Sequence, residues 1–484
     1  MPAPSETPEP SGKPVLVLQM QRMGDLILSF PLLLWLARKY PGRPLWVCAE
    51  RIFYEPLMGI GPRAVYIPWE GADFLRRHEY EAVLNLSIRE EAARLAGEVR
   101  ADRKLGPALA PARDARRILG DWQLYRASVV HNNRHNRFHW ADLNALDAVP
   151  LADMAATRFD APRNLGPGRA RVGLFLGASE PSKRPDAAFW AALVREMLGR
   201  GLRPALFGGP AEVEAGREVE RLAGGKILNY CGRLGLDELA AAGQTLHLFV
   251  TPDTGPMHLA AWTGTRVLNL SVGNVSPWET GPYQPGHYVL RADIPCAPGC
   301  WTCTRDEILC RAPFTPKAVA FLAARLCRSA EADGTDRLAR SALPGLRLFR
   351  TGRDADGLYH LERVDPGPDS ADDLLGAFWK AFFGAAFGLW GPDRAAAPLD
   401  ALSAHPEGAA ALDELRAALP GLGRAFTHGL RTGAPLAPDF WSAAPLPLRA
   451  FTGHAHMLLA NDDYAPAAWA RAVDLFDRLH RAVA

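Results

Sequence analysis

The sequence predicts an α/β protein with two lobes, each built on a parallel sheet covered by helices on both sides, followed by a mostly helical C-terminal appendage. Short apolar runs alternate with helical patterns in two successive stretches, which is typical of parallel sheets. A proline- and glycine-rich link without periodicity separates the two stretches near residues 150–170. The 484 residues also exceed what one ordinary core accommodates, so more than one domain is expected.

The first lobe is expected over residues 14–155, after a proline-rich polar tail at 1–13 that is typical of disorder. An apolar stripe at 26–40 ends in basic residues, as a helix C-terminus prefers, and predicts one long helix. The four buried strands predicted in this lobe lie at 15–19, 45–49, 64–67 and 82–86.

The second lobe is expected over residues 165–330 and repeats the same rhythm. Its predicted strands and helices are, in turn, strands at 172–176, 204–207, 246–250 and 266–270 and helices at 187–200 and 211–223. The appendage is expected over residues 335–484. It begins with a predicted hairpin at 346–364 and continues as alanine- and leucine-rich helices broken by proline.

Composition and charge exclude several classes of protein. The net charge of +2 provides no global basic field, so nucleic acid is not an expected partner. The N-terminal tail lacks the apolar segment of a signal peptide. The most apolar stretch, 374–390, is short and carries Lys380, so a buried or interfacial helix is expected there and not a membrane span. Together these features predict a cytoplasmic protein.

The run from Thr251 to Thr265 is the most informative stretch of the chain. It follows an apolar strand, breaks at Thr254 and Gly255 after Asp253, and places Pro256 where a first helical turn tolerates proline. Such a turn offers free N–H groups and a positive dipole end to an anion, typically a phosphate, and His258 adds a possible donor. The alternative is an ordinary strand–turn–helix in which Asp253 caps the helix.

Two other turns carry candidate chemistry. After the strand at 172–176, Gly177 allows close backbone approach, Ser179 offers a hydroxyl and Lys183 brings charge, a set that suits a diphosphate. The spacing is not that of a P-loop, and a solvated basic loop is the alternative. After the first strand, Gly24 permits a tight turn, and Asp25 stands near the start of the next helix, either as a cap or as a base toward a substrate hydroxyl.

Cysteine and histidine clusters suggest two further sites. Four of the seven cysteines lie close together, with a spacing that suits tetrahedral zinc or iron: Cys296, Cys300, Cys303 and Cys310. A structural metal site and free or partly paired thiols both remain open, and neither is catalytic. The segment HNNRHNRFHWAD (131–142) concentrates histidine and arginine, which makes a metal site conceivable, while the family resemblance described below implies a contact with an acidic acceptor surface there.

Four segments occur in the order and spacing of the motifs of a known family. They are QRMGDLILSFPLLLWLARKYP (21–41), GASEPSKRPDAAFWAAL (177–193), NYCGRLGLDELAAA (229–242) and TPDTGPMHLAAWTGTRVLNL (251–270). Through them, residues 14–328 resemble glycosyltransferase family 9, the ADP-heptose:lipopolysaccharide heptosyltransferases.

The resemblance implies a GT-B fold, in which two Rossmann-like lobes with parallel sheets face a cleft. It implies that the lobe at 165–330 binds the nucleotide sugar and that the lobe at 14–155 binds the acceptor. It also implies that the reaction inverts the configuration at the anomeric carbon. Asp25 would be the general base on the acceptor hydroxyl. The donor diphosphate would be held by Ser179, Lys183, His258 and the N–H groups near Thr254, Gly255 and Pro256, while Asp253 orients this turn or contacts the sugar. Because these groups carry the charge, no catalytic metal or cofactor is required.

The partners that the resemblance implies are ADP-heptose and a lipopolysaccharide core or related glycan acceptor, with peripheral contact at the inner face of the inner membrane. The segment 270–273 departs from the family pattern in the donor site, which leaves the donor sugar open. Two other functions stay open as well. One is a non-catalytic binding or assembly protein, and the other is a protein-modifying glycosyltransferase whose appendage recruits the polypeptide.

Overall fold

The computed structural model describes residues 12–484 except for 111–114, 167, 304, 329–342 and 365–366. Most of the predicted tail at 1–13 lies outside the described residues. The chain forms two compact units, the first made of residues up to 124 with 141–157, and the second of 125–140 with 158–484. This division differs from the predicted boundaries, because the segment 125–140 and the described residues after 342 belong to the same unit as the second lobe.

The first unit is built on a six-stranded sheet in the order β3-β2-β1-β4-β5-β6 among the described residues. All neighbouring strands run parallel except β5 and β6. The strand order reverses between β1 and β4, so their carboxyl ends border the kind of crevice where open α/β sheets bind ligands. The strands are β1 (Val15–Leu18), β2 (Leu45–Ala49), β3 (Val65–Pro68), β4 (Glu79–Asn85), β5 (Arg100–Ala110) and β6 (Ala115–Leu119).

The helix predicted at 26–40 is present as two helices, α1 (Met23–Leu28) and α2 (Phe30–Lys39). Pro31 lacks an N–H group and stands in the first turn of α2, where none is needed, so a new helix begins there. The Ser29 hydroxyl at the junction donates to the Leu26 carbonyl at 2.6 Å. The helices that follow up to residue 155 are α3 (Arg51–Tyr54), η1 (Glu55–Leu57), η2 (Trp69–Gly71), α4 (Ala72–Arg76), α5 (Glu90–Glu98), α6 (Asp121–Ser128), α7 (Trp140–Leu143) and α8 (Leu151–Ala155).

The second unit is built on an eight-stranded sheet in the order β14-β13-β12-β11-β10-β7-β8-β9 within the described part of the chain. The strands from β7 to β12 are parallel, and the order reverses between β7 and β10. The strands are β7 (Arg171–Phe175), β8 (Arg203–Phe207), β9 (Leu228–Asn229), β10 (Leu248–Pro252), β11 (Val267–Ser271), β12 (Tyr288–Ala292), β13 (Leu346–Arg353) and β14 (Tyr359–Arg363).

Helices cover this second sheet, and the two helices predicted there are present. Apolar side chains of α9, such as Trp190 and Val194, are buried in one core with Val172 and Leu290 of the sheet. The helices that flank the sheet are η3 (Pro181–Lys183), α9 (Ala187–Gly199), η4 (Pro210–Glu212), α10 (Val213–Ala223), α11 (Leu236–Gly243), α12 (Gly255–Trp262), α13 (Pro277–Thr280), η5 (Leu309–Arg311) and α14 (Pro316–Arg328).

The predicted hairpin is present as the antiparallel pair β13 and β14. It does not stand apart from the second lobe, because β13 also pairs with β12 in antiparallel register, with Leu290 opposite Leu348. Leu346 and Leu348 are buried in the same core as the parallel strands. The hairpin therefore extends the sheet of the second lobe.

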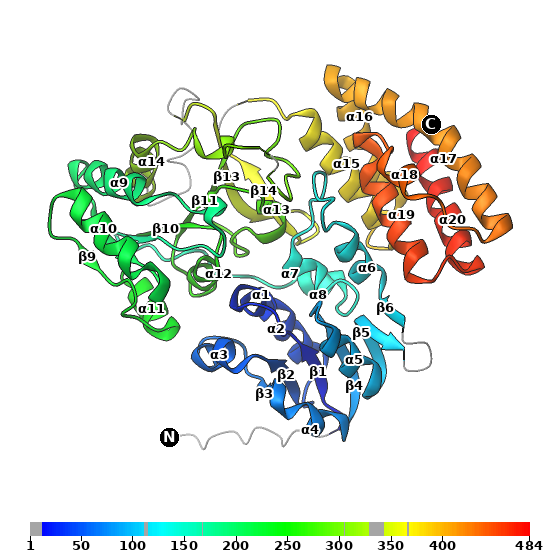
Figure 1. The fold of residues 1–484 in the computed structure, drawn as a ribbon, viewed down its shortest axis with the longest axis horizontal. Helices are drawn as coiled ribbons and strands as arrows, with labels where there is room; N and C mark the ends of the chain where they lie inside the picture. The colour runs from blue at the N-terminus through cyan, green and yellow to red at the C-terminus, as the bar shows by residue number, and fades with distance from the viewer. Residues whose placement is uncertain (1–11, 111–114, 167, 304, 329–342, 365–366) are drawn as a thin grey trace. The chain divides into compact units, whose positions relative to one another are not determined.

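The remaining C-terminal residues are helical, as predicted, and are coloured yellow to red in Figure 1. The long helix α17 packs against α20, and Gly429 provides the close contact, because a Cβ atom there would lie 2.3 Å from the Trp469 ring. The helices are α15 (Ala371–Ala386), η8 (Pro392–Ala395), α16 (Ala396–Ala404), α17 (Pro406–Thr432), α18 (Pro438–Ser442), η9 (Leu446–Leu448), α19 (Arg449–Asn461) and α20 (Pro466–Val483).

The predicted fold class, two Rossmann-like lobes of the GT-B kind with a helical C-terminal region, is confirmed for each lobe taken by itself. Among the described helices, none combines the length and the apolar character needed to span a bilayer.

Candidate functional site

The candidate donor site lies at the carboxyl ends of β7 and β10, where the strand order of the second sheet reverses. Open α/β sheets bind ligands in the crevice at such a point. The segments that follow these two strands are the ones in which the sequence predicts phosphate binding. Residues far apart in the chain are thus brought to one edge of the sheet.

Lys183 is held at this edge with little freedom. It ends the short helix η3, and only 8% of its surface is exposed. Its Nζ atom lies 4.0 Å from Oδ2 of Asp253 and 3.6 Å from Oε1 of Glu180. Gly273, with φ of 87°, leaves room for it, since a Cβ atom there would lie 3.3 Å from Cγ of Lys183. Lys183 and Asp253, predicted separately as donor-site residues, are therefore brought together.

The turn after β10 leads into α12 as predicted. The N-cap residue is Thr254, not Asp253, and Pro256 occupies the first turn of the helix. Within the described residues, no side-chain hydrogen bond caps Thr254. Pro256 has no N–H group and the Met257 N–H donates to the Thr254 carbonyl at 3.0 Å, so the Gly255 N–H is the backbone group that this helix start can offer to an anion. Asp253 accepts a hydrogen bond from Oγ1 of Thr280 at 3.4 Å. Gly255 is the first helical residue and lets the backbone approach a ligand closely.

His258 lies one turn into α12 and is 7% exposed. Its Nδ1 atom is buried and has no hydrogen-bond partner among the described residues. Burial lowers the pKa of this histidine to about 4, so the ring is neutral at physiological pH. It offers an N–H donor and no positive charge.

The loop after β7 has one exposed and one closely packed candidate. Ser179 is exposed, which leaves its hydroxyl available to a ligand. Gly177 is buried, and a Cβ atom there would lie 2.7 Å from the Glu212 carboxylate. The absence of a side chain at Gly177 is thus required by Glu212.

Asp25 and Gly24 belong to the first unit, beyond the end of β1 at the point where that sheet also reverses. Both lie in the first turn of α1, so Gly24 is helical and does not form the predicted tight turn. The Arg22 N–H donates to Oδ2 of Asp25 at 3.2 Å. Asp25 is half-buried, which is compatible with contact to a substrate.

A buried polar network beside the donor site has no local signal in the sequence. Glu279 of α13 is 2% exposed and accepts hydrogen bonds from Nδ2 of Asn133 at 2.6 Å and Nδ2 of Asn136 at 3.1 Å. Burial raises its pKa to about 7, although both amide hydrogen bonds act in the opposite direction. Because Thr280 follows Glu279, the network fixes the residue that contacts Asp253.

Arg291 is a second residue that the sequence analysis did not identify. It is 8% exposed and donates to Oγ of Ser271 at 2.8 Å and to the Val275 carbonyl at 2.7 Å. These bonds hold both ends of the loop that carries Gly273. The isolated arginine in a buried strand is the signal that would have identified it.

The prediction that the segment 131–142 contacts an acidic acceptor is wrong. Asn133, His135, Asn136, Arg137 and His139 are buried. The segment's basic side chains contact a carboxylate of the same unit and not an external acceptor. Arg134 makes two hydrogen bonds of 2.7 Å to the carboxylate of Asp372, and His135 Nε2 lies 3.1 Å from the same carboxylate.

The predicted zinc or iron site at the four cysteines is not formed among the described residues, where no group of three or more His, Cys, Asp or Glu side chains is arranged to hold a metal ion. The four cysteines line a cavity of about 250 Å³. Cys303 is exposed, and Cys310 accepts a hydrogen bond from the Gly273 N–H at 3.3 Å. The alternative of free thiols is the one observed.

Parts of this chain are similar to known proteins. Residues 72–307 match the family model described as glycosyltransferase family 9 (heptosyltransferase), a segment that contains the donor-site residues but not Asp25. Lipooligosaccharide heptosyltransferase 2 of Campylobacter jejuni is 29% identical over 198 residues, which are 39% of this chain and 59% of that protein. The chain thus matches less than two thirds of that curated relative.

Two solved structures are also similar. The E. coli ADP-heptose lps heptosyltransferase II has 19% identity and a TM-score of 0.49, over 65% of this chain and 98% of its own. The glycosyl transferase family 9 protein of Veillonella parvula has 21% identity and a TM-score of 0.45, over 57% of this chain and 85% of its own. Residues 72–307 of this chain are thus similar to the glycosyltransferase family 9 domain.

Proposed function

We propose that this protein is an inverting, metal-independent glycosyltransferase that moves heptose from ADP-heptose to a lipopolysaccharide core or related glycan. The observation that carries the proposal is the pairing of Lys183 with Asp253 beside the open start of α12, at the reversal point of the second sheet. A cation and a helix N-terminus at one sheet edge suit a diphosphate. The family match and the heptosyltransferase relative support the choice of reaction.

In the proposed reaction, Asp25 accepts the proton of the acceptor hydroxyl. The hydroxyl oxygen then forms a bond to the anomeric carbon from the face opposite the diphosphate, which inverts that centre. The bond from the carbon to the diphosphate oxygen breaks, and its electron pair leaves with ADP. Lys183, the Gly255 N–H group at the start of α12 and the neutral His258 would stabilise the charge that develops on the leaving group.

Asp253 has an orienting role in this proposal. Its contacts with Lys183 and Thr280 would fix the position of the Lys183 ammonium group relative to the start of α12. The acceptor would be presented at the inner face of the inner membrane, where its lipid part is anchored and the protein binds peripherally.

The experiment combines nucleotide binding with turnover. Thermal-shift assays with ADP, UDP and GDP should show stabilisation by ADP, because only a ligand of the folded state raises the unfolding temperature. Asp25→Asn should bind ADP as the wild type does but release ADP from ADP-heptose about 10²- to 10⁴-fold more slowly in the presence of acceptor. Asp73→Asn, which changes an exposed carboxylate of the same unit, is the matched control.

Two results would overturn the proposal. The first is stabilisation by UDP or GDP in place of ADP, which contradicts the donor. The second is full turnover by the Asp25 variant, which contradicts the base. A wild-type protein that binds ADP without any turnover would favour the non-catalytic alternative.

A further inference from the structure

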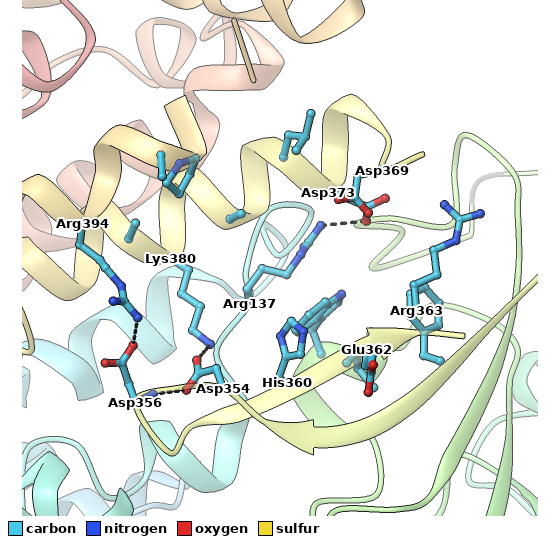
Figure 2. Close-up of a pocket in the computed structure, with 18 of the residues that line it drawn as sticks. Arg137, Asp354, Asp356, His360, Glu362, Arg363, Asp369, Asp373, Lys380 and Arg394 are labelled. Atoms are coloured by element: carbon cyan, nitrogen blue, oxygen red, sulfur yellow. Dashed lines mark hydrogen bonds and ion pairs between the residues drawn. The ribbon is translucent and has the colours of Figure 1, made fainter. Parts of the chain in front are cut away.

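A second cavity, of about 550 Å³, lies where the β13–β14 hairpin faces α15 (Figure 2). Its size is in the range of small-molecule sites. None of the donor-site residues lines it. Only Arg137 and Trp278 of its lining belong to the segment that matches the family model, and the other lining residues follow residue 345. The C-terminal region therefore adds a separate candidate site to the family domain.

The charges in this cavity do not favour a phosphate. Four cationic and five anionic side chains line it. Each cation already has a partner. Three form ion pairs, which Figure 2 shows: Lys380 with Asp354 at 2.6 Å, Arg394 with Asp356 at 2.5 Å and Arg137 with Asp373 at 3.6 Å. The fourth, Arg363, donates a hydrogen bond to the Pro368 carbonyl at 2.6 Å. A phosphate would have to displace one of these partners and would meet a net negative wall.

The cavity offers hydrogen-bond acceptors to a neutral ligand. The carboxylates of Glu362 and Asp369 are exposed and have no ion pair within the described part of the chain. His360 lies between them and Lys380 along the wall, and burial lowers its pKa, so its ring is neutral. Charged acceptors such as these bind hydroxyl groups strongly.

Aromatic and apolar side chains form the rest of the wall. Trp278 is half-buried, with the His360 ring at 5.6 Å in an edge-on arrangement and the Arg137 guanidinium 5.1 Å from its ring centre. Trp390, also half-buried, lines the cavity next to Arg394. Flat aromatic surfaces beside hydroxyl acceptors suit a sugar ring, which has an apolar face of C–H groups and a polar edge of hydroxyls.

We propose that this cavity binds a neutral saccharide, with Trp278 against the apolar face of a sugar ring and Glu362 and Asp369 accepting hydrogen bonds from its hydroxyls. That this saccharide is part of the glycan acceptor rests on the proposed function. The binding itself does not, because the cavity shares no residue with the donor site.

The test uses the full-length protein and saturation-transfer difference NMR with the methyl glycosides of glucose, galactose, mannose and heptose. At least one glycoside should bind. Glu362→Gln keeps the size of an exposed side chain and should weaken binding about tenfold, since a charged acceptor is lost. Trp278→Leu should weaken it by about as much. Asp400→Asn, an exposed carboxylate of α16 outside the cavity, is the matched control.

Unchanged melting temperatures show that the variants are folded, and the Glu362 change alone keeps the test valid if Trp278→Leu unfolds. Absence of transfer to every glycoside overturns the proposal, and so does equal affinity in wild type and Glu362→Gln. Tighter binding of glucose 6-phosphate than of glucose, or binding of tetralysine alone, also overturns it. The change in melting temperature with ADP is an independent measurement. If ADP does not stabilise the protein, the proposed donor is wrong, but glycoside binding that depends on Trp278 still supports the saccharide site.

Discussion

The Nδ2 atom of Asn133 lies 2.6 Å from Oε2 of Glu279, although 146 positions separate the two residues in the chain. The hydrogen bond is buried and joins the segment 125–140 to the short helix α13. The next residue of that helix, Thr280, donates to Asp253 in the candidate donor site. A polar pair away from the strand ends thus positions a carboxylate at the site.

Glu279→Gln should flatten the pH dependence of stability. Burial raises the pKa of Glu279 from 4.5 to about 7, so the folded protein holds a proton that the unfolded chain releases. Its contribution is therefore fully present below about pH 4.5 and declines as the pH rises to about 7. Urea unfolding across this range should show a smaller decline in the variant. Glu214→Gln, at an exposed position, should keep the wild-type decline.

Lys183→Met should weaken ADP binding by roughly tenfold to hundredfold, because a charge-assisted hydrogen bond to the diphosphate is lost. Isothermal titration calorimetry measures this loss. Lys226→Met, an exposed lysine of the same unit, should bind ADP as the wild type does. An unchanged dissociation constant in the Lys183 variant would place the diphosphate elsewhere.

His454→Leu should make the protein more tolerant of acid. His454 is 2% exposed, and its ring packs within 5.5 Å of Phe383, measured between ring centres. Burial lowers its pKa from 6.5 to about 3. The unfolded chain therefore takes up a proton that the folded protein excludes, and stability falls as the pH drops below about 6.5. The melting temperature of the variant should fall less over this range than that of the wild type. An equal fall in both proteins would contradict the assignment.

Asp372→Asn should destabilise the protein by about 2 kcal/mol, since it leaves the half-buried Arg134 and the buried His135 without their charged partner. Burial would raise the pKa of Asp372, but its bonds to His135 and Arg134 hold it well below the usual range, so the carboxylate is charged. Asp413→Asn changes an exposed ion pair and should cost less than about 0.5 kcal/mol. Chemical denaturation of both variants measures the contrast, and equal losses would refute it.

Apart from the hairpin, the strands that the sequence predicted are apolar runs, and it missed β5 and β12, which contain charged residues. The strands at 172–176 and 204–207 were predicted within one residue of their observed bounds. The strand β5 (Arg100–Ala110) begins with alternating charges near one edge of its sheet, and β12 contains the buried Arg291. The helix at 26–40 divides because Pro31 starts a new helix, although the apolar stripe continues through it.

In the candidate site, residues placed by their neighbours in the chain could be predicted, and residues placed by contacts with distant parts of the chain could not. The turn from Asp253 to His258 is set by neighbouring residues, so its strand, cap region and proline could be placed in advance. The burial of Glu279 depends on two asparagines far away in the chain, and nothing near it indicates their contact. Arg134 was expected at the surface because arginine is mostly exposed, and its partner Asp372 comes 238 positions later.

The antiparallel pairing of β13 with β12 has a practical consequence for preparing this protein. A chain cut after the segment that matches the family model would leave the outer edge of β12 with unpaired N–H and C=O groups, a template for self-association. Recombinant fragments meant to contain the second lobe should therefore extend at least through Arg363, so that the last parallel strand keeps its antiparallel neighbour.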